Sequence, residues 1–279
     1  MTAEPQHLER ITAYYAKHVE ARFQGVARAY DNFGYWADNP ADFEEAGFRL
    51  LEAVANRAGI GPDDEVLDAG CGCGASSLDL AEEWGCRRVV GIDVTAAMLT
   101  IGRRRAVSRA LDARVSFHTM SATALQLPDA SFTRVIAIDC ADMFDPREAF
   151  LAEAFRVLRP GGVLAIADVV AGTAPVGPIQ RAMVRGLMRY FGIPRVNYYG
   201  VEGYRARLVA AGFREVSIES VGDAVIPGAV ACALSERFRA DFRAACGRVE
   251  TAVNSLVFRV IGRAYRQRLG DYVFIVARK

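Results

Sequence analysis

The sequence lacks an excess of charge of either sign. Its 279 residues carry 34 lysines and arginines against 33 aspartates and glutamates, a formal net charge of +1. Proteins that bind nucleic acid usually carry a clear basic excess, so this balance argues against a nucleic-acid partner. Arginine clusters at 103–105 and 263–268 lie on segments with helical spacing, where solvated helix faces explain them.

Histidines and paired cysteines are also scarce. The sequence has three histidines and six cysteines, and no Cys-x-x-Cys pair stands beside a second pair or a histidine at metal-ligand spacing. The sequence therefore predicts no metal site. The scattered cysteines suit small buried residues of a protein in the reducing cytoplasm.

Long apolar runs are missing as well. No stretch approaches the ~20 apolar residues of a membrane span, and the N-terminus carries Glu4, Glu9 and Arg10 without an apolar run of secretory length. We therefore expect no membrane partner and no signal peptide. With 52% hydrophobic residues and no internal repeats, the protein can form one large domain or one domain with an elaborated cap.

The stretch around which the sequence is organised is rich in glycine. Residues 66–74 read VLDAGCGCG, and the apolar run at their start is typical of a buried parallel strand. Glycines at alternate positions allow a sharp turn and a close approach of the backbone to a ligand, which a Cβ would block. The helix expected from Ala75 would present its free N–H groups and positive dipole end to the same place. Asp68 is expected to point at whatever this turn holds.

A second acid follows at the spacing of a strand–helix–strand unit. Asp93 ends the next apolar strand, 88–92, and such an acid can bind a ribose diol. Nicotinamide dinucleotide folds use Gly-x-Gly-x-x-Gly, but here the third glycine comes one residue early. In addition, an acid stands two residues before the first glycine. The spacing therefore argues against a dehydrogenase.

This variant resembles the first motif of class I S-adenosyl-L-methionine (SAM)-dependent methyltransferases, Asp/Glu-x-Gly-x-Gly-x-Gly. Residues 127–128, 156–162 and 270–279 look like later segments of that family in order, and the resemblance is strong over about 60–170. Within the family the sequence is similar to small-molecule enzymes related to the ubiquinone, menaquinone and sterol methyltransferases, including C-methyltransferases of secondary metabolism that act on prenyl groups. The resemblance implies an α/β fold with a Rossmann-like, seven-stranded, doubly wound sheet whose last strand is antiparallel.

The resemblance also implies SAM as cofactor and a set of contacts to it. Relatives often place an aspartate where this protein has Ser121, and a serine hydroxyl accepts a hydrogen bond from the adenine amino group more weakly than a carboxylate does. Residues 30–36 resemble an aromatic stretch near the methionine end of the cofactor, where aromatic faces suit a sulfonium; a plug in the core is the alternative. The expected cofactor-binding residues are Asp68, Gly70, Gly72, Gly74, Asp93, Val94, Met98, Ser121, Ala122, Thr123, Asp139 and Tyr35.

The loop after the fourth strand, at 139–144, is expected to face the reacting centre, because ligands bind beyond the carboxyl ends of parallel strands. Related enzymes often carry a histidine near Met143, proposed as a general base, and this protein has methionine there. Asp142 is the nearest remaining candidate base; orienting a substrate group or capping the next helix are its other roles. His18 reaches the site only if the N-terminal helix is a lid, and His118 lies on a strand as a structural residue.

Residues 1–58 are expected to form a helical arm, and residues 59–279 the methyltransferase domain with a substrate cap at about 171–200. Helical spacing from Gln6 to Tyr30 predicts an amphipathic helix, packed on the flank of the sheet or serving as a lid or subunit contact that would make a homo-oligomer. The cap segment is rich in methionine and aromatics, which suits core packing or an adaptable acceptor pocket. The residues expected at the acceptor are Tyr15, Met143, Phe144, Met188, Tyr198 and Tyr199.

Methyl transfer needs a general base only when the acceptor must lose a proton to react. A methionine at the expected base position therefore favours an acceptor that is already nucleophilic, and the aromatic content favours an apolar one. We expect C-methylation of an isoprenoid or aromatic carbon of a natural product, with tyrosine faces steadying a carbocation. The alternatives are O- or N-methylation of a small aromatic or amine acceptor and, from another class, a SAM-binding protein that transfers no methyl group, such as a pericyclase or regulatory module.

Overall fold

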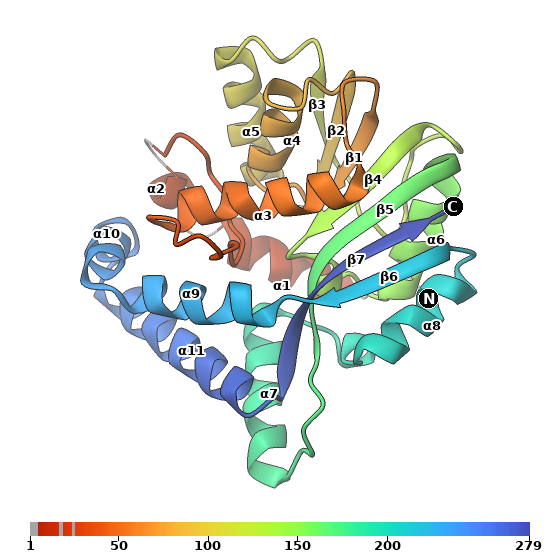
Figure 1. Ribbon diagram of the computed structural model, residues 1–279. Coiled ribbons are helices and arrows are strands. Elements are labelled where there is room, and N and C mark those ends of the chain that lie inside the picture. Colours follow the sequence, from red (N-terminus) through yellow and green to blue (C-terminus); the bar gives the residue numbers. More distant parts are fainter. Residues whose placement is uncertain (1–4, 17–18, 24–25) are drawn as a thin grey trace.

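A computed structural model describes residues 5–16, 19–23 and 26–279, and its centre is a seven-stranded sheet (Figure 1). The strands are β1 (Glu65–Ala69), β2 (Arg88–Asp93), β3 (Val115–Thr119), β4 (Phe132–Ile138), β5 (Leu158–Ala171), β6 (Arg214–Ser220) and β7 (Gly270–Arg278). Their order is β3-β2-β1-β4-β5-β7-β6, and β7 runs antiparallel to both of its neighbours while the other pairs are parallel. The predicted Rossmann-like sheet with an antiparallel last strand is confirmed.

Helices cover both faces of this sheet, as the 3.6-residue spacing of their apolar positions requires. They are α1 (Pro5–Ala16), α2 (Val19–Phe23), α3 (Phe43–Ala58), α4 (Ala75–Glu82), α5 (Ala96–Ser108), α6 (Arg147–Val157), α7 (Pro178–Phe191), α8 (Val201–Ala210), α9 (Gly222–Leu234), α10 (Glu236–Cys246) and α11 (Arg248–Arg266), with the 3₁₀ turns η1 (Ala141–Met143) and η2 (Arg195–Asn197). One apolar cluster joins α3, α4, α5, α9 and α11 to the sheet, and a second joins α6 and α8 to its other face.

Two segments differ from the sequence-based expectation. Within the described ranges the helix expected from Gln6 to Tyr30 is present as α1 and α2, but it does not reach Tyr30, because residues 26–42 contain neither helix nor strand. The long helical stretch expected at 230–268 is three helices, α9, α10 and α11, and α9 begins earlier, at Gly222. Ser235 caps α10, and Gly247 separates α10 from α11 with a positive φ of 89°, a conformation that glycine adopts without strain. Figure 1 shows α9 and α11 side by side, with α10 at their far end.

The predicted boundary at residue 58 coincides with the end of α3. This helix nevertheless belongs to the packed body of the protein, because Leu50, Leu51 and Val54 are buried against the sheet. The division into 1–58 and 59–279 stays a prediction. No helix in the described ranges is long and apolar enough to cross a membrane.

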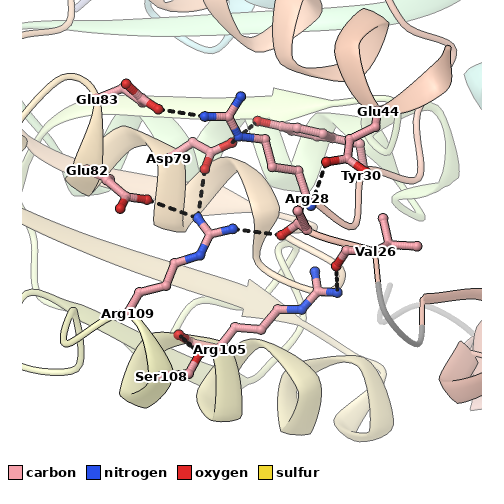
Figure 2. A network of polar contacts seen from close by, with 11 residues as sticks. Val26, Arg28, Tyr30, Glu44, Asp79, Glu82, Glu83, Arg105, Ser108 and Arg109 are labelled. Atoms are coloured by element: carbon pink, nitrogen blue, oxygen red, sulfur yellow. Dashed lines mark hydrogen bonds and ion pairs between the residues drawn. The ribbon is translucent and has the colours of Figure 1, made fainter.

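The linker between the arm and α3 is held by a buried carboxylate on α4 (Figure 2). Asp79 has no exposed surface; it accepts a hydrogen bond from Tyr30 Oη at 2.5 Å and forms ion pairs with Arg28 at 3.2 Å and Arg109 at 2.9 Å. A buried carboxylate is stable only when it is paired and hydrogen-bonded. Asp79 therefore ties the linker to the helix that follows the glycine-rich turn.

Two arginines, one in α5 and one just after its last residue, donate hydrogen bonds to backbone carbonyls of the same region (Figure 2). Arg105 donates to the carbonyl oxygens of Phe23 at 3.1 Å and Val26 at 2.8 Å. Arg109 donates to the carbonyl of Ala27 at 2.7 Å. Because residues 26–42 have no regular secondary structure, these side chains supply partners that a helix or sheet would otherwise provide.

Candidate functional site

The glycine-rich turn joins β1 to α4. Gly70, Gly72 and Gly74 have φ of +74°, +54° and +77°, so the predicted sharp turn is present. At two of the three positions packing within the protein also requires glycine, because the nearest neighbours are other parts of the protein; the close approach to a ligand stays a prediction. A Cβ at Gly70 would lie 2.7 Å from Cys140 Sγ, and one at Gly74 would lie 2.4 Å from the Phe117 ring.

Gly72 differs, since a Cβ there would meet nothing closer than Met98 Cε at 3.2 Å. Its N–H donates to Asp93 Oδ2 at 3.1 Å, and the N–H of Thr95 donates to Asp93 Oδ1 at 2.7 Å. Burial raises the pKa of Asp93, and these two N–H donors oppose the shift. The predicted ribose-binding acid is therefore held at the end of β2, beside the glycine-rich turn.

Asp68 lies one strand away and is fully engaged with α4. Its Oδ2 accepts a hydrogen bond from Ser77 Oγ at 2.6 Å. Burial raises the pKa of Asp68 to about 7, and the Ser77 hydroxyl opposes this shift. The carboxyl thus fastens the first turns of α4 to β1, and its predicted contact with the cofactor stays a prediction.

A groove of about 540 Å³ lies beyond β2 and β3, at the expected adenine end of the site. Val94 and Ser121 line one wall, and Leu8 and Ala16 of α1 line the opposite wall. Ser121 Oγ lies 2.8 Å from Thr123 Oγ1. The remaining predicted residues of this end are buried: Ala122 packs in the core and Met98 lies against Val19, Phe23 and Cys73.

Asp139 follows β4 in a left-handed conformation with φ of +53°. Its Oδ2 accepts from the Phe33 N–H at 2.6 Å, while Oδ1 is buried and has no hydrogen-bond partner within the described ranges. Burial raises the pKa of Asp139 to about 7, and the Phe33 N–H opposes this shift. The Tyr272 hydroxyl is near enough to lower the pKa as well, but its geometry makes no hydrogen bond to Asp139 within the described ranges. A buried, unpaired carboxyl oxygen costs free energy unless a donor reaches it, which suits a site for a polar or cationic group.

These observations fit SAM. Carboxylates end β2 and β4, hydroxyls of Ser121 and Thr123 follow β3, and the Gly72 N–H holds the Asp93 carboxylate beside the glycine-rich turn. Asp93 and Ser121 would hold the ribose and adenine, and the free oxygen of Asp139 suits the ammonium of the methionine part.

A cavity of about 760 Å³ adjoins this site, with Asp139 in its wall, and lies between the arm, α7, α10 and α11. This volume lies in the range of small-molecule sites. Its walls are mainly apolar and aromatic, and include Tyr15, Phe33, Leu187, Met188, Phe191 and Phe258. The predicted cap residue Met188 is thus part of both the apolar core and the cavity wall, as is the predicted Tyr15 of the arm.

Asp142 and Met143 are part of this cavity wall, which also includes polar side chains such as Asp139, Arg147 and Asn197. Asp142 lies in η1 and is 8% exposed; burial raises the pKa of its carboxyl well above the ordinary range, the negative charge of Asp168 adds to this, and Arg147 opposes it. Tyr15 Oη donates a hydrogen bond to Met143 Sδ at 3.3 Å, which joins α1 to η1. The structure therefore brings together three of the predicted catalytic and acceptor residues.

Asn197, which sequence patterns did not single out, fastens the turn that carries Asp142. Its Nδ2 donates to the carbonyl oxygens of Asp142 at 2.8 Å and Phe144 at 2.7 Å, and its Oδ1 accepts from the Arg147 N–H at 3.2 Å. An asparagine just after Ile193-Pro194 in the expected cap gives no periodic signal. Only the fold shows that η2 lies against η1.

Three other predicted residues make contacts within the protein, two by ring packing and one by a hydrogen bond. The Tyr35 ring packs on Phe274 of β7 with centroids 5.8 Å apart, and the Phe144 ring packs on Phe150 at 4.9 Å. Tyr198 lines the cavity and donates to the carbonyl of Leu269 at 2.8 Å.

The remaining predicted residues are distributed as follows. The Tyr199 ring lies under the Arg207 guanidinium, 3.9 Å from its centroid. His118 is exposed on β3 beside Ser116. His18 lies outside the described residues. Within the described ranges no group of three His, Cys, Asp or Glu side chains is arranged to hold a metal ion.

Comparison with known proteins shows the family of the protein. Residues 66–162 match the family model described as "Methyltransferase domain". The chain is 38% identical over 216 residues to erythromycin 3''-O-methyltransferase of Saccharopolyspora erythraea, which covers 76% of this chain and 70% of the relative. The chain belongs to the SAM-dependent methyltransferases. It is also 32% identical over 246 residues to 27-O-demethylrifamycin SV methyltransferase of Amycolatopsis mediterranei, covering 88% of each.

Solved structures show the same fold. Geranyl diphosphate C-methyltransferase from Streptomyces coelicolor, in complex with Mg²⁺, geranyl-S-thiolodiphosphate and S-adenosyl-L-homocysteine, superposes with a TM-score of 0.77 at 19% identity and covers 100% of this chain and 99% of that one. The [4+2]-cyclase SpnF superposes with a TM-score of 0.76 at 24% identity, covering 98% and 96%. At these identities the likeness concerns the fold alone. This SAM-dependent methyltransferase is of the small-molecule, natural-product type, as the sequence predicted.

Proposed function

We propose that this methyltransferase transfers a methyl group to a hydroxyl oxygen of a large, mostly apolar natural product. The observation that carries the proposal is the Asp142 carboxyl in the wall of the apolar cavity of about 760 Å³. Methionine at position 143 led us to expect an acceptor that needs no base. Burial raises the pKa of the neighbouring Asp142, so its carboxylate is a stronger proton acceptor than that of an ordinary aspartate, which suits a hydroxyl acceptor.

Two relatives support oxygen as the acceptor atom. The names of the relatives from Saccharopolyspora erythraea and Amycolatopsis mediterranei both specify O-methylation, of erythromycin at the 3'' position and of a rifamycin at position 27. We infer an acceptor of similar size, because the cavity is large and its wall offers more aromatic and aliphatic surface than polar groups.

The residues act by positioning, proton transfer and exclusion of water. SAM, when bound, supplies an activated methyl group; the new oxygen–methyl bond replaces the sulfur–methyl bond, and S-adenosyl-L-homocysteine remains. The apolar wall positions the acceptor and keeps water away from its hydroxyl. Asp142, in its ionised form, accepts the hydroxyl proton as that bond forms. The hydrogen bond from Tyr15 to Met143 holds α1 against η1, the turn that carries Asp142.

The test uses the full-length protein, SAM with a deuterated methyl group, and a panel of hydroxylated macrolide glycosides, ansamycins, phenols, amines and prenyl compounds. Mass spectrometry and NMR of the products locate the new methyl group. We expect a methyl ether, and a rate lowered by ~10²–10⁴-fold in Asp142→Asn, the usual contribution of a general base. The exposed Asp112→Asn is the control. A methyl group on carbon or nitrogen, or full activity of Asp142→Asn, would contradict the proposal.

The second candidate is C-methylation of an isoprenoid or aromatic carbon, which the sequence favoured. The observation in its favour is the group of tyrosines at the cavity: the Tyr14 ring lies edge-on to those of Tyr15, at 5.0 Å, and Tyr190, at 5.6 Å. Such faces stabilise a carbocation. The two candidates differ in the product and in the effect of Asp142→Asn on the rate. This substitution should leave alkene methylation largely intact, because no proton leaves before attack.

A further inference from the structure

A cluster of charged side chains lies next to Asp142, and its Arg147 also lines the cavity. Arg147, Asp168 and Tyr204 have no exposed surface. The Arg147 guanidinium lies between the rings of Tyr199 and Tyr204, 4.7 and 4.6 Å from their centroids, and its Nη2 is 3.5 Å from Asp168 Oδ2. A guanidinium this deeply buried needs a charged partner and aromatic faces to be tolerated.

The position of Arg147 is coupled to the turn that carries Asp142. Its Nε donates to the carbonyl of Ala141 at 3.0 Å, one residue before Asp142, and its backbone N–H donates to Asn197. Nη1 and Nη2 have no hydrogen-bond partner among the described residues. The guanidinium is therefore fixed by stacking, by one carbonyl and by the charge of Asp168.

Asp168 and Asp142 lie in unequal surroundings. Asp168 Oδ1 accepts from the Val169 N–H at 2.9 Å and Oδ2 accepts from Tyr204 Oη at 3.0 Å. Burial raises the pKa of Asp168, and Arg147 and these two donors oppose this shift because they favour the charged form. Asp142 has fewer such contacts and reaches the cavity. The other titratable groups that influence Asp142 are Asp139 after β4, Cys140 in the same loop, Tyr15 of α1 and Tyr272 of β7.

We propose that Arg147 and Asp168 are a buried positioning pair: Arg147 keeps Asp168 ionised, and the ionised Asp168 makes Asp142 the carboxyl that takes up the proton of the acceptor. This inference rests on the proposed function, since it explains how Asp142 serves as a base without the usual histidine. The single positive charge of Arg147 offsets one of the two carboxylate charges, so the second carboxyl holds a proton. The unequal contacts make Asp142 the carboxyl that holds it. Neither Arg147 nor Asp168 needs to touch the acceptor.

The pair can be tested without an acceptor. Aspartate labelled with ¹³C at Cγ reports the ionisation of each carboxyl by NMR as a function of pH, and Asp→Asn variants assign the signals. We expect the Asp142 signal to titrate well above the range of ordinary aspartates. In Asp168→Asn its midpoint should fall by at least about one pH unit, because a neighbouring negative charge is gone. Asp112→Asn should leave it unchanged.

A second variant covers the case in which Asp168→Asn does not fold. Tyr204→Phe removes one donor from Asp168 and leaves both carboxyls in place. The proton should then be shared more evenly: the Asp168 signal should take a larger part of the higher-pH step, and the Asp142 signal a smaller part. Loss of packing alone would not redistribute the titration between the two signals.

An Asp142 midpoint in the ordinary range, or one unmoved by both variants, would overturn the inference. The proposed function fails by a different result, namely carbon methylation or unchanged turnover in Asp142→Asn. The two failures are thus distinguished, because the NMR titration needs no acceptor and the product analysis needs no titration.

Discussion

At the scale of single residues, the glycine-rich turn shows how one pattern serves two purposes. All three glycines have positive φ, and a Cβ would overlap the protein's own atoms at Gly70 and Gly74 more severely than at Gly72, where the nearest atom is Met98 Cε at 3.2 Å. The sequence motif identifies the turn. It does not show which of its glycines Cys140 and Phe117 require.

Gly74→Ala should therefore be more destabilising than a left-handed conformation alone explains. Gly59 is the matched control, because its φ is +61° and a Cβ there meets nothing within 4 Å. We expect Gly59→Ala to lower the free energy of unfolding by ~1–2 kcal/mol, the cost of the left-handed conformation. Gly74→Ala should cost a further ~1–3 kcal/mol, because its Cβ overlaps the Phe117 ring. Urea unfolding measures both, and equal losses would contradict the packing argument.

Asp142 leads to a prediction on pH dependence. Burial and the charge of Asp168 raise its pKa, and a base acts only when ionised. Methylation of a hydroxyl acceptor should therefore increase as the pH rises through that raised pKa. Initial rates at saturating SAM and acceptor measure this limb. If the same limb persists in Asp142→Asn, another group is responsible for it.

At the scale of secondary-structure elements, the turn η1 is held in position by hydrogen bonds from η2, which is distant in sequence. Asn197 satisfies two carbonyls and one N–H of the residues around η1. Asn197→Ala leaves these buried groups unpaired and should lower the free energy of unfolding by ~2–4 kcal/mol, from about 1–3 for each lost partner less relaxation. Asn197→Asp keeps the acceptor but loses both donors and should show most of the loss. A loss below about 0.5 kcal/mol would mean that water replaces the side chain.

The arm depends on α5 in a similar way. Arg105 holds the carbonyls of Phe23 and Val26, and α1 forms one wall of the groove at Val94 and Ser121. We expect Arg105→Ala to loosen the arm and to speed dissociation of S-adenosyl-L-homocysteine about fivefold, equivalent to about 1 kcal/mol, a typical net value for such hydrogen bonds.

Stopped-flow fluorescence measures this rate, and hydrogen exchange of residues 8–16 reports whether the arm loosens. Arg214→Ala, on the far edge strand, is the control. An unchanged rate with faster exchange would show that the arm does not cover bound cofactor. The predicted homo-oligomer through the N-terminal helix remains a proposal, to be tested by light scattering of the full-length protein.

At the scale of the whole molecule, buried carboxyls gather at the carboxyl edge of the sheet. Burial raises the pKa of both Asp68 and Asp139 to about 7, compared with about 3.9 in an unfolded polypeptide. Between these values the folded state holds protons that the unfolded state has lost, so stability falls as the pH rises from about 4 to about 7. A site that collects carboxylates thus costs stability at neutral pH.

Asp68→Asn removes one of these groups. The difference in free energy of unfolding between the native protein and the variant should shift in favour of the variant as the pH rises through this window, and level off above it. Urea unfolding at intervals from about pH 4 to about pH 8 measures the difference. A difference independent of pH would show that Asp68 titrates in the ordinary range.

The sequence by itself determined the fold family and the cofactor. The Gly-x-Gly-x-Gly turn after a strand, the acid ending the next strand and the later motifs are local in sequence, and local patterns specify local backbone. The family resemblance that these motifs carry implied the seven-stranded sheet, the antiparallel β7 and SAM. The same holds for the position of Asp142 at the end of a parallel strand.

Only the tertiary structure decided how the acceptor side is built. Asn197, Arg147 and Asp168 meet beside Asp142 from three different elements, and the cavity is closed by the arm together with α10 and α11, which are far from the arm in sequence. No periodicity in the sequence predicts these contacts, because they depend on the way the sheet brings remote segments together. The ionisation of Asp142 depends on the same contacts, since burial and neighbouring charges, not residue type, set the pKa of a carboxyl.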